Sequence, residues 1–127
     1  MKSTLSLVIL IIVTAMFFMG SRIIENNNQL KITYPHAVKQ IIDKKCYGCH
    51  NIKGNSQNAK EALMWDSLPN LSTRVLVSTL DKIIEVVDKE AMPPGNFTKK
   101  YPEAKLLPGE RELLKSWAEV KADNIMK

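Results

Sequence analysis

The run Cys46-Tyr47-Gly48-Cys49-His50 governs the interpretation of the whole 127-residue chain. It has the C-x-x-C-H spacing of covalent c-type haem attachment. In that chemistry each thiol forms a thioether with one vinyl group on the same porphyrin edge, and the next residue turns its imidazole under the ring as an iron ligand. The chain has no cysteines besides these two. The motif therefore predicts one covalent haem c with His50 as its proximal ligand.

Three other interpretations of the motif remain open. A structural zinc site takes four Cys or His ligands, and besides the motif the chain offers only the distant His36. A C-x-x-C redox dithiol is expected where a strand runs into a helix, whereas the segment before Cys46 has a helical pattern. A plain disulfide gives no reason for the adjoining histidine. We favour haem attachment because it uses both thiols and His50 together.

Met92, in Glu90-Ala91-Met92-Pro93-Pro94-Gly95, is the predicted sixth ligand. A thioether is a soft, neutral ligand for haem iron, and His/Met ligation raises the reduction potential. The two prolines fix φ and bias the preceding residue toward extended geometry. A helix is therefore expected to end at about Met92. Met64 is a rival ligand, but it lies beside Leu63 in an apolar helical pattern and is better explained as core.

Several aromatic and basic residues are weaker candidates for the same site. His36 would give a bis-His haem, although a surface histidine is the simpler explanation. Trp65 and Trp117 could line the haem or donate an indole N–H to a propionate, but core packing is the safer interpretation. Lys99-Lys100-Tyr101 are expected either near one haem face or in a solvated basic loop.

The front of the chain indicates export. Lys2 is followed by the uncharged apolar run Ser3–Ser21, which ends at Arg22. A short cationic segment before an apolar one is typical of an export signal, and this run reaches the roughly 17–25 residues of a membrane-spanning helix. Because no A-x-A-like cleavage site follows, we favour an uncleaved anchor over a removed signal peptide. The rest is expected on the periplasmic side, anchored to the inner membrane, or soluble in the periplasm if cleaved.

The sequence predicts that the chain has three parts. Residues 1–21 are the signal peptide or membrane anchor, residues 22–33 a polar linker, and residues 34–127 one small haem-binding domain. Domains of this size bury a modest core and are often marginal without a cofactor. A haem would supply the missing apolar centre.

Apolar periodicity predicts an all-α domain, because no stretch alternates well enough for a strand. The first helix is expected to be capped by Thr33, to include Pro35 early, and to deliver Cys46 to the haem. Its inward face would carry Val38, Ile41 and Ile42.

Three further helices are expected at about residues 58–65, 72–90 and 108–122. The middle one has a buried stripe of Leu76, Leu80, Ile83, Ile84 and Val87. Its solvated face would carry Asp81, Glu85 and Asp88. The last helix is expected to turn Leu113, Leu114 and Trp117 inward.

The order of these features resembles the monohaem cytochrome c family, and most closely the small haem-binding domains of exported bacterial cytochromes. The resemblance covers about residues 34–120. Besides the C-x-x-C-H motif it rests on Met92-Pro93-Pro94, on Tyr101-Pro102-Glu103-Ala104-Lys105-Leu106, and on a final helix that ends near Trp117.

The resemblance implies a complete set of haem contacts and one packing feature. It implies thioethers at Cys46 and Cys49, proximal His50 and distal Met92. It also implies a close crossing of the first and last helices. One departure is that Leu107, rather than Ser or Thr, precedes the proline that opens the last helix. The missing cap would cost roughly 0.5–2 kcal/mol.

Charge and motif content together limit the function. The formal net charge of +5 is compatible with an acidic redox partner or an anionic membrane surface. Few aromatics and no basic stripe argue against nucleic-acid binding. Because no base, nucleophile or open coordination position is evident, the predicted function is electron transfer by a six-coordinate haem, not enzymatic catalysis.

Three alternatives to a free electron carrier stay open. One is a haem-based sensor or small-gas binder in which Met92 is displaced or never bound. Another is a haem subunit of a larger membrane oxidoreductase, and a third is a thiol oxidoreductase without haem. The sequence leaves the electron donor and acceptor, the reduction potential and the oligomeric state undefined.

Overall fold

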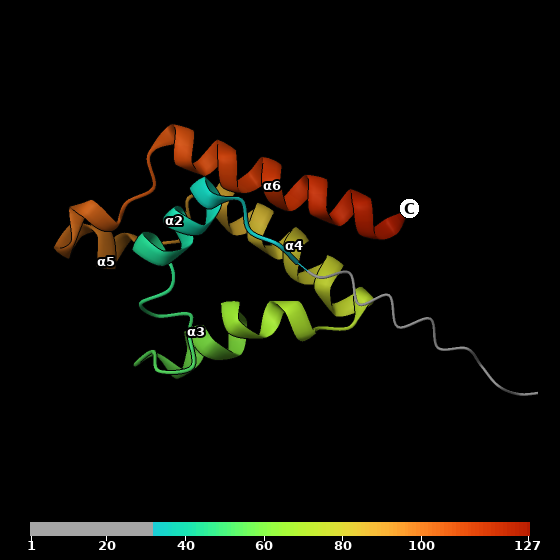
Figure 1. Ribbon diagram of the computed structural model, residues 1–127. Helices are drawn as coiled ribbons and strands as arrows, with labels where there is room; N and C mark the ends of the chain where they lie inside the picture. Colours follow the sequence, from blue (N-terminus) through green and yellow to red (C-terminus); the bar gives the residue numbers. More distant parts are fainter. Residues whose placement is uncertain (1–31) are drawn as a thin grey trace, which may run out of the picture.

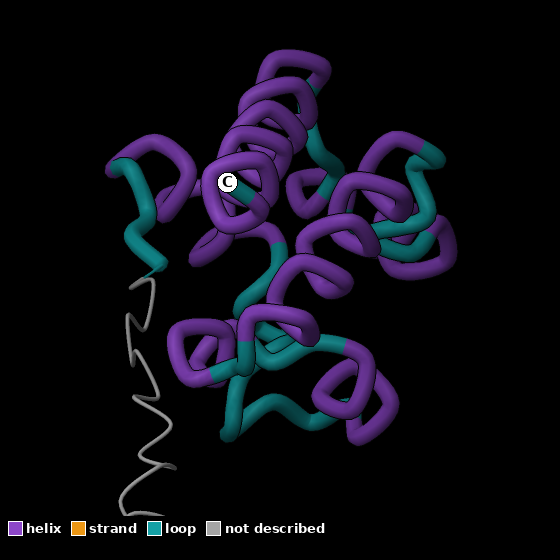
Figure 2. The backbone as a smooth tube through the Cα atoms, turned by 90° about the vertical axis from the view of Figure 1, so that its right-hand side faces the viewer, coloured by secondary structure: helices purple, strands orange, loops and turns teal. Residues whose placement is uncertain are grey.

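The computed structural model of the protein describes residues 32–127 (Figure 1). In chain order the elements are α2 (His36–Lys45), α3 (Gln57–Ala62), the 3₁₀ helix η1 (Trp65–Asn70), α4 (Thr73–Asp88), α5 (Gly95–Lys100), the 3₁₀ helix η2 (Pro102–Ala104) and α6 (Pro108–Met126). These residues form helices and loops without a strand, which confirms the all-α class (Figure 2).

The predicted N-terminal anchor or signal peptide, and most of the predicted linker, lie outside the described residues. Among the helices from residue 32 onward, none is long and apolar enough to cross a membrane. Ile32, which was assigned to the linker, is only 5% exposed and belongs to the core.

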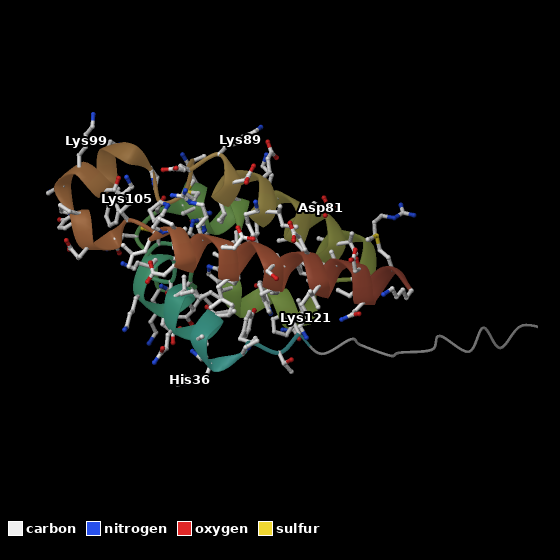
Figure 3. All side chains as sticks on the ribbon, turned by 90° about the horizontal axis from the view of Figure 1, so that it is seen from above. His36, Asp81, Lys89, Lys99, Lys105 and Lys121 are labelled. Atoms are coloured by element: carbon white, nitrogen blue, oxygen red, sulfur yellow. The ribbon has the colours of Figure 1, made fainter. Side chains whose placement is uncertain are left out.

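The core is built on two long antiparallel helices, α4 and α6, which lie side by side (Figures 1 and 3). Their buried faces consist of Leu76, Leu80, Ile83 and Val87 on α4, and Leu114, Trp117, Ala118 and Ala122 on α6. The predicted stripe on α4 is therefore confirmed, with Ile84 half-buried beside it. Two ion pairs join α6 to the end of α4 and to the turn after it. They link Lys115 with Asp88 and Arg111 with Glu90.

The first helix, α2, packs against α6 as the resemblance implied. It buries the predicted residues Val38, Ile41 and Ile42. An aromatic cluster closes this end of the core: the ring centroid of Tyr34 lies 6.2 Å from that of Trp65 and 5.4 Å from that of Trp117. Both tryptophans are buried, which confirms them as core residues.

The predicted cap of the first helix is wrong. Helix α2 begins at His36, and Pro35 occupies the capping position with extended geometry and no side-chain cap. The residue before a proline is disfavoured in helical geometry, so the helix cannot extend back through Tyr34. Thr33 instead accepts the indole N–H of Trp117 at its carbonyl oxygen, at 3.3 Å.

The helix predicted at residues 58–65 is two shorter elements. Helix α3 begins after Ser56, whose hydroxyl accepts the Ala59 N–H at 3.2 Å, and it ends at Ala62. Leu63 is extended, with φ −160° and ψ 131°, and the 3₁₀ helix η1 follows. The chain leaves helical geometry here because the Leu63 carbonyl is used by the site described below.

The last two predicted helices also differ at their ends. Helix α4 stops at Asp88 rather than near Met92. Helix α6 runs on to Met126, and Leu113 is 41% exposed rather than inward. At the start of α6 the Glu110 carboxylate accepts the Leu107 backbone N–H at 2.9 Å. Since leucine has no side-chain acceptor, this is half of a capping box, and it replaces part of the missing cap.

Candidate functional site

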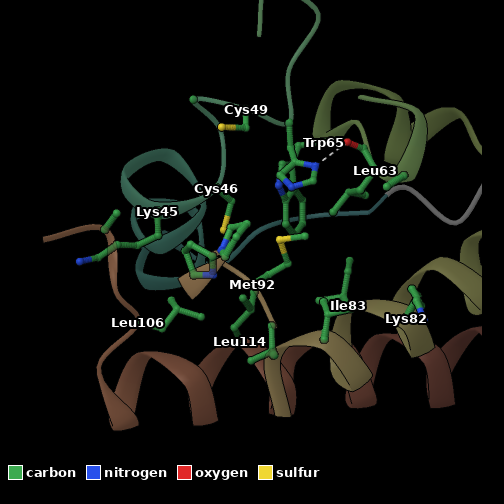
Figure 4. A pocket seen from close by; sticks show the side chains of 18 of the residues that line it. Lys45, Cys46, Cys49, Leu63, Trp65, Lys82, Ile83, Met92, Leu106 and Leu114 are labelled. Carbon is green, nitrogen blue, oxygen red and sulfur yellow. Dashed lines mark hydrogen bonds between the residues drawn. The ribbon is translucent and has the colours of Figure 1, made fainter. Parts of the chain in front are cut away.

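A cavity of about 940 Å³ opens between the C-x-x-C-H turn, η1, α4 and the segment that leads to α5 (Figure 4). This volume lies near the upper end of the roughly 300–1,000 Å³ of small-molecule and cofactor sites. Its apolar wall includes Leu63, Trp65, Ile83, Val86, Leu106 and Leu114. The cavity is large and apolar enough for a flat aromatic cofactor.

The four predicted site residues, Cys46, Cys49, His50 and Met92, all line this one cavity. The sulfur atoms of Cys46 and Met92 point into it in Figure 4. The two rival ligands are not brought there: Met64 is half-buried outside the cavity wall, and His36 is exposed at the edge of the molecule (Figure 3). Sequence positions far apart therefore converge on one space.

The turn that carries the two thiols continues the winding of α2. Cys46 ends that helix, and its carbonyl oxygen accepts the N–H groups of Cys49 at 3.2 Å and His50 at 3.1 Å. Because these two bonds close a single helical turn, both thiols and the imidazole are presented from one tight piece of backbone. Both cysteines are free thiols.

The His50 imidazole is oriented by two backbone carbonyls. Its Nδ1 lies 2.9 Å from the carbonyl oxygen of Ala59 and 2.9 Å from that of Leu63. Carbonyl oxygens only accept, so Nδ1 carries the proton and Nε2 keeps its lone pair. Donation from the outer nitrogen to a carbonyl is the usual way in which a ligating histidine is held and made more basic.

Tyr47, one of the two residues between the cysteines, attaches the turn to η1. The Tyr47 hydroxyl donates to the Asp66 carboxylate, whose other oxygen accepts the Ile52 N–H at 3.1 Å. The hydrogen bond to Asp66 raises the pKa of Tyr47. The backbone of Trp65 also donates to the His50 carbonyl oxygen at 3.1 Å. These hydrogen bonds hold the C-x-x-C-H turn against η1.

Burial, followed by the charges of Glu110 and Cys49, raises the pKa of the Cys46 thiol to about 12. A reactive cysteine needs a lowered pKa, because the thiolate is the nucleophile and metal ligand. Cys46 is therefore a neutral thiol, which disfavours the redox-dithiol interpretation. Among residues 32–127, no group of three or more His, Cys, Asp or Glu side chains could hold a metal ion.

The donor set fits a haem. The cavity wall offers two thiols for thioethers, an imidazole nitrogen with a free lone pair and a methionine thioether, together with mostly apolar surface. In addition, the indole Nε1 of Trp65 is buried without a hydrogen-bond partner among the described residues. A buried unsatisfied donor beside a cavity is most simply explained by an acceptor on a bound group. The corresponding atom of Trp117 already donates to Thr33.

The residues that sequence reasoning missed act mostly through their backbone. The carbonyl groups of Ala59 and Leu63 have no side-chain signature. Gly54 is buried, and a Cβ there would overlap the Cys49 carbonyl oxygen. The predicted basic segment at residues 99–101 ends the short helix α5, where Lys99 and Lys100 are exposed while Tyr101 lines the cavity.

A family model described as a haem-binding domain matches residues 51–120, which is more than half of the chain. The matched segment begins directly after His50 and includes Met92 and most of α6. It confirms the resemblance to small haem-binding domains. No curated protein and no solved structure matches the chain.

Proposed function

The chain belongs to the haem-binding domain family, and we propose that it is an exported monohaem c-type cytochrome that transfers electrons through a His/Met-ligated haem. The observation that carries the proposal is that Cys46, Cys49, His50 and Met92 line one cavity. A bound haem would supply a one-electron ferrous/ferric couple whose potential is raised by a methionine ligand.

The two thiols would hold the cofactor covalently. Cys46 and Cys49 are free, lie on one helical turn and face the same cavity. Their role is structural: thioethers fix the porphyrin edge against the end of α2, so the cofactor cannot leave during turnover. A neutral, buried Cys46 is consistent with this role.

His50 would be the proximal ligand through Nε2. The two carbonyl bonds at Nδ1 fix both the tautomer and the ring plane, so the lone pair is aimed without further rearrangement. Since both carbonyls belong to the α3 segment, this segment acts as the support for the ligand.

Met92 would be the distal ligand, and its position favours electron transfer over catalysis. With both axial positions supplied by protein side chains, no coordination position remains for a substrate. The apolar wall would limit water at the haem, and both ligands would stay in place when the charge changes, so little would have to rearrange during transfer. The cavity lining carries three lysines, Lys44, Lys45 and Lys82, and three acidic residues, Asp81, Glu85 and Glu103. Docking on an acidic redox partner would therefore rely on the net charge of +5 of the whole chain.

The ligand assignment is tested by substitution of the two candidate methionines. Met92→Ala is expected to abolish the weak far-red sulfur-to-iron absorption band of the ferric protein that the resemblance implies. Met64→Ala is the matched control, because Met64 is half-buried but does not line the cavity, and it should leave the band unchanged. A band that persists in Met92→Ala contradicts the assignment.

The sensor interpretation is favoured by one observation: Met92 is carried by a loop rather than a helix. Such a ligand could be displaced by a small gas. Rapid binding of carbon monoxide to the reduced wild-type protein would support a sensor, whereas slow binding limited by release of Met92 would support an electron carrier.

Covalent attachment and export are tested together by the intact mass of protein produced with a working cytochrome maturation system. We expect the mass of one haem in addition to the polypeptide, and the same spectrum identifies the N-terminus. Protein without the added mass would contradict haem c, and a mass that retains residues 1–21 would support the membrane anchor.

A further inference from the structure

The backbone that leads from α4 to Met92 has an unusual residue at its turning point. The N–H of Glu90 donates to the Val87 carbonyl oxygen at 3.2 Å, and the N–H of Ala91 donates to that of Val86 at 2.9 Å. This pair of bonds defines a Schellman motif, in which the left-handed position is usually glycine. Here it is Glu90, with φ 53°. A side chain at this position is sterically disfavoured, so the choice of glutamate calls for another explanation.

The Glu90 side chain supplies that explanation. Its Oε1 accepts a hydrogen bond from the Arg111 guanidinium of α6 at 2.8 Å. The arginine side chain is only 22% exposed, so it is held against the protein surface. This ion pair attaches the left-handed turn to α6.

Met92 is hydrogen-bonded within the same turn. Its own N–H donates to the Val86 carbonyl oxygen at 3.3 Å, the same acceptor that Ala91 uses. If the turn at Glu90 opens, this shared acceptor is lost and the Met92 side chain is free to leave the cavity. The order of the contacts is therefore Arg111 to Glu90, Glu90 to the turn, and the turn to Met92.

We propose that the Glu90–Arg111 ion pair positions Met92 as the sixth ligand and sets how readily that ligand is displaced. The proposal rests on the His/Met ligation proposed above. Glu90 and Arg111 do not act on the iron themselves; they are positioning residues that act through the backbone of the turn. They would tune the same protein between a closed electron carrier and one with an accessible iron.

The chain provides a closely matched control. Asp88 accepts from Lys115 at 2.6 Å, a second ion pair to α6 that starts from the end of α4 rather than from the turn after it. The exposed fractions are also alike, with 22% for Lys115 and 62% for Asp88, against 22% for Arg111 and 54% for Glu90. Asp88, however, is the last residue of α4 and lies before the left-handed turn.

The experiment measures the binding of imidazole, a competing axial ligand, to the ferric holoprotein. Its apparent dissociation constant is inversely proportional to the fraction of protein with Met92 dissociated. Loss of an exposed ion pair is expected to raise that fraction about two- to fivefold. Glu90→Ala and Arg111→Gln should therefore bind imidazole about two- to fivefold more tightly than wild type. Asp88→Ala should bind as wild type.

Two further readouts separate positioning from a general loss of stability. Glycine adopts a positive φ without steric penalty, so Glu90→Gly keeps the left-handed turn, and it is expected to unfold at a higher temperature and to bind imidazole less tightly than Glu90→Ala. Amide exchange of Ala91 and Met92 in the reduced protein should be faster in Glu90→Ala than in Asp88→Ala.

Two results would overturn the positioning role: an unchanged imidazole affinity in Glu90→Ala, or an equal increase in Asp88→Ala. Failure of the proposed function looks different. In that case the ferric wild type itself lacks the far-red band, whereas failure of the positioning role leaves the band in wild type and in every variant.

Discussion

At the scale of single residues, the site depends on backbone groups as much as on side chains. His50 is held by the carbonyl oxygens of Ala59 and Leu63, and Met92 by that of Val86. That Cys46, Cys49 and His50 share one turn was predictable because they are adjacent in sequence. The carbonyl partners were not, because any residue type supplies the same carbonyl and only the folded chain selects which one is used.

Gly54 gives a prediction at this scale. A Cβ at Gly54 would overlap the Cys49 carbonyl oxygen and lie 2.9 Å from its carbonyl carbon, both backbone atoms that cannot rotate away. Gly54→Ala is therefore expected to lower the free energy of unfolding by about 1–3 kcal/mol, as overpacking usually does. Urea unfolding of the holoprotein measures it. Gly109→Ala is the control, because a Cβ there meets nothing within 4 Å and Gly109 does not line the cavity, and equal losses in both variants would contradict the prediction.

At the scale of elements, apolar periodicity predicted which helix residues the core buries. It failed to predict where helices end beside the site. The stripe of α4 and the inward face of α2 follow from apolar spacing alone. The break at Leu63 does not, because no proline or glycine marks it and its cause is the tertiary hydrogen bond to His50. The early end of α4 was missed for a related reason: glutamate occupies the left-handed position where glycine would have signalled a stop.

Helix α3 gives the prediction at this scale, since it carries one of the carbonyls that hold His50. Its Ser56 hydroxyl accepts the Ala59 N–H, whereas Ser72, at the same position of α4, makes no side-chain cap bond. Ser56→Ala is expected to lower the free energy of unfolding by about 1 kcal/mol, and Ser72→Ala by clearly less. Chemical unfolding of both variants compares them directly. A larger loss for Ser72→Ala would show that the cap on α3 is not stabilising.

At the scale of the whole molecule, the residues just before α2 meet η1 and α6 in one aromatic cluster. Tyr34 donates its hydroxyl to the Trp65 carbonyl oxygen at 3.4 Å and packs against the ring of Trp117, whose indole binds the Thr33 carbonyl. The cluster joins the wall of the cavity to the crossing of α2 and α6. Its convergence could not be predicted from sequence, because three aromatic residues far apart in the chain show no common period.

The cluster makes stability sensitive to alkaline pH. Burial, followed by the charge of Asp66, raises the pKa of Tyr34 from 10.0 to about 12. The folded state therefore favours the protonated phenol. This contribution is complete below pH 10, where the phenol is protonated in both states, and it is lost between pH 10 and 12, where only the unfolded chain ionises. The free energy of unfolding should consequently fall more steeply in wild type than in Tyr34→Phe across this range.

Urea unfolding of the holoprotein at several pH values from 8 to about 11.5 measures the two slopes. Tyr101→Phe controls for loss of a hydroxyl from a side chain that is 40% exposed, and it should follow wild type. Parallel curves for wild type and Tyr34→Phe would mean that the phenol ionises equally in both states. The aromatic cluster would then open without unfolding, and the segment before α2 could not be treated as part of the cooperative core that holds the cavity together.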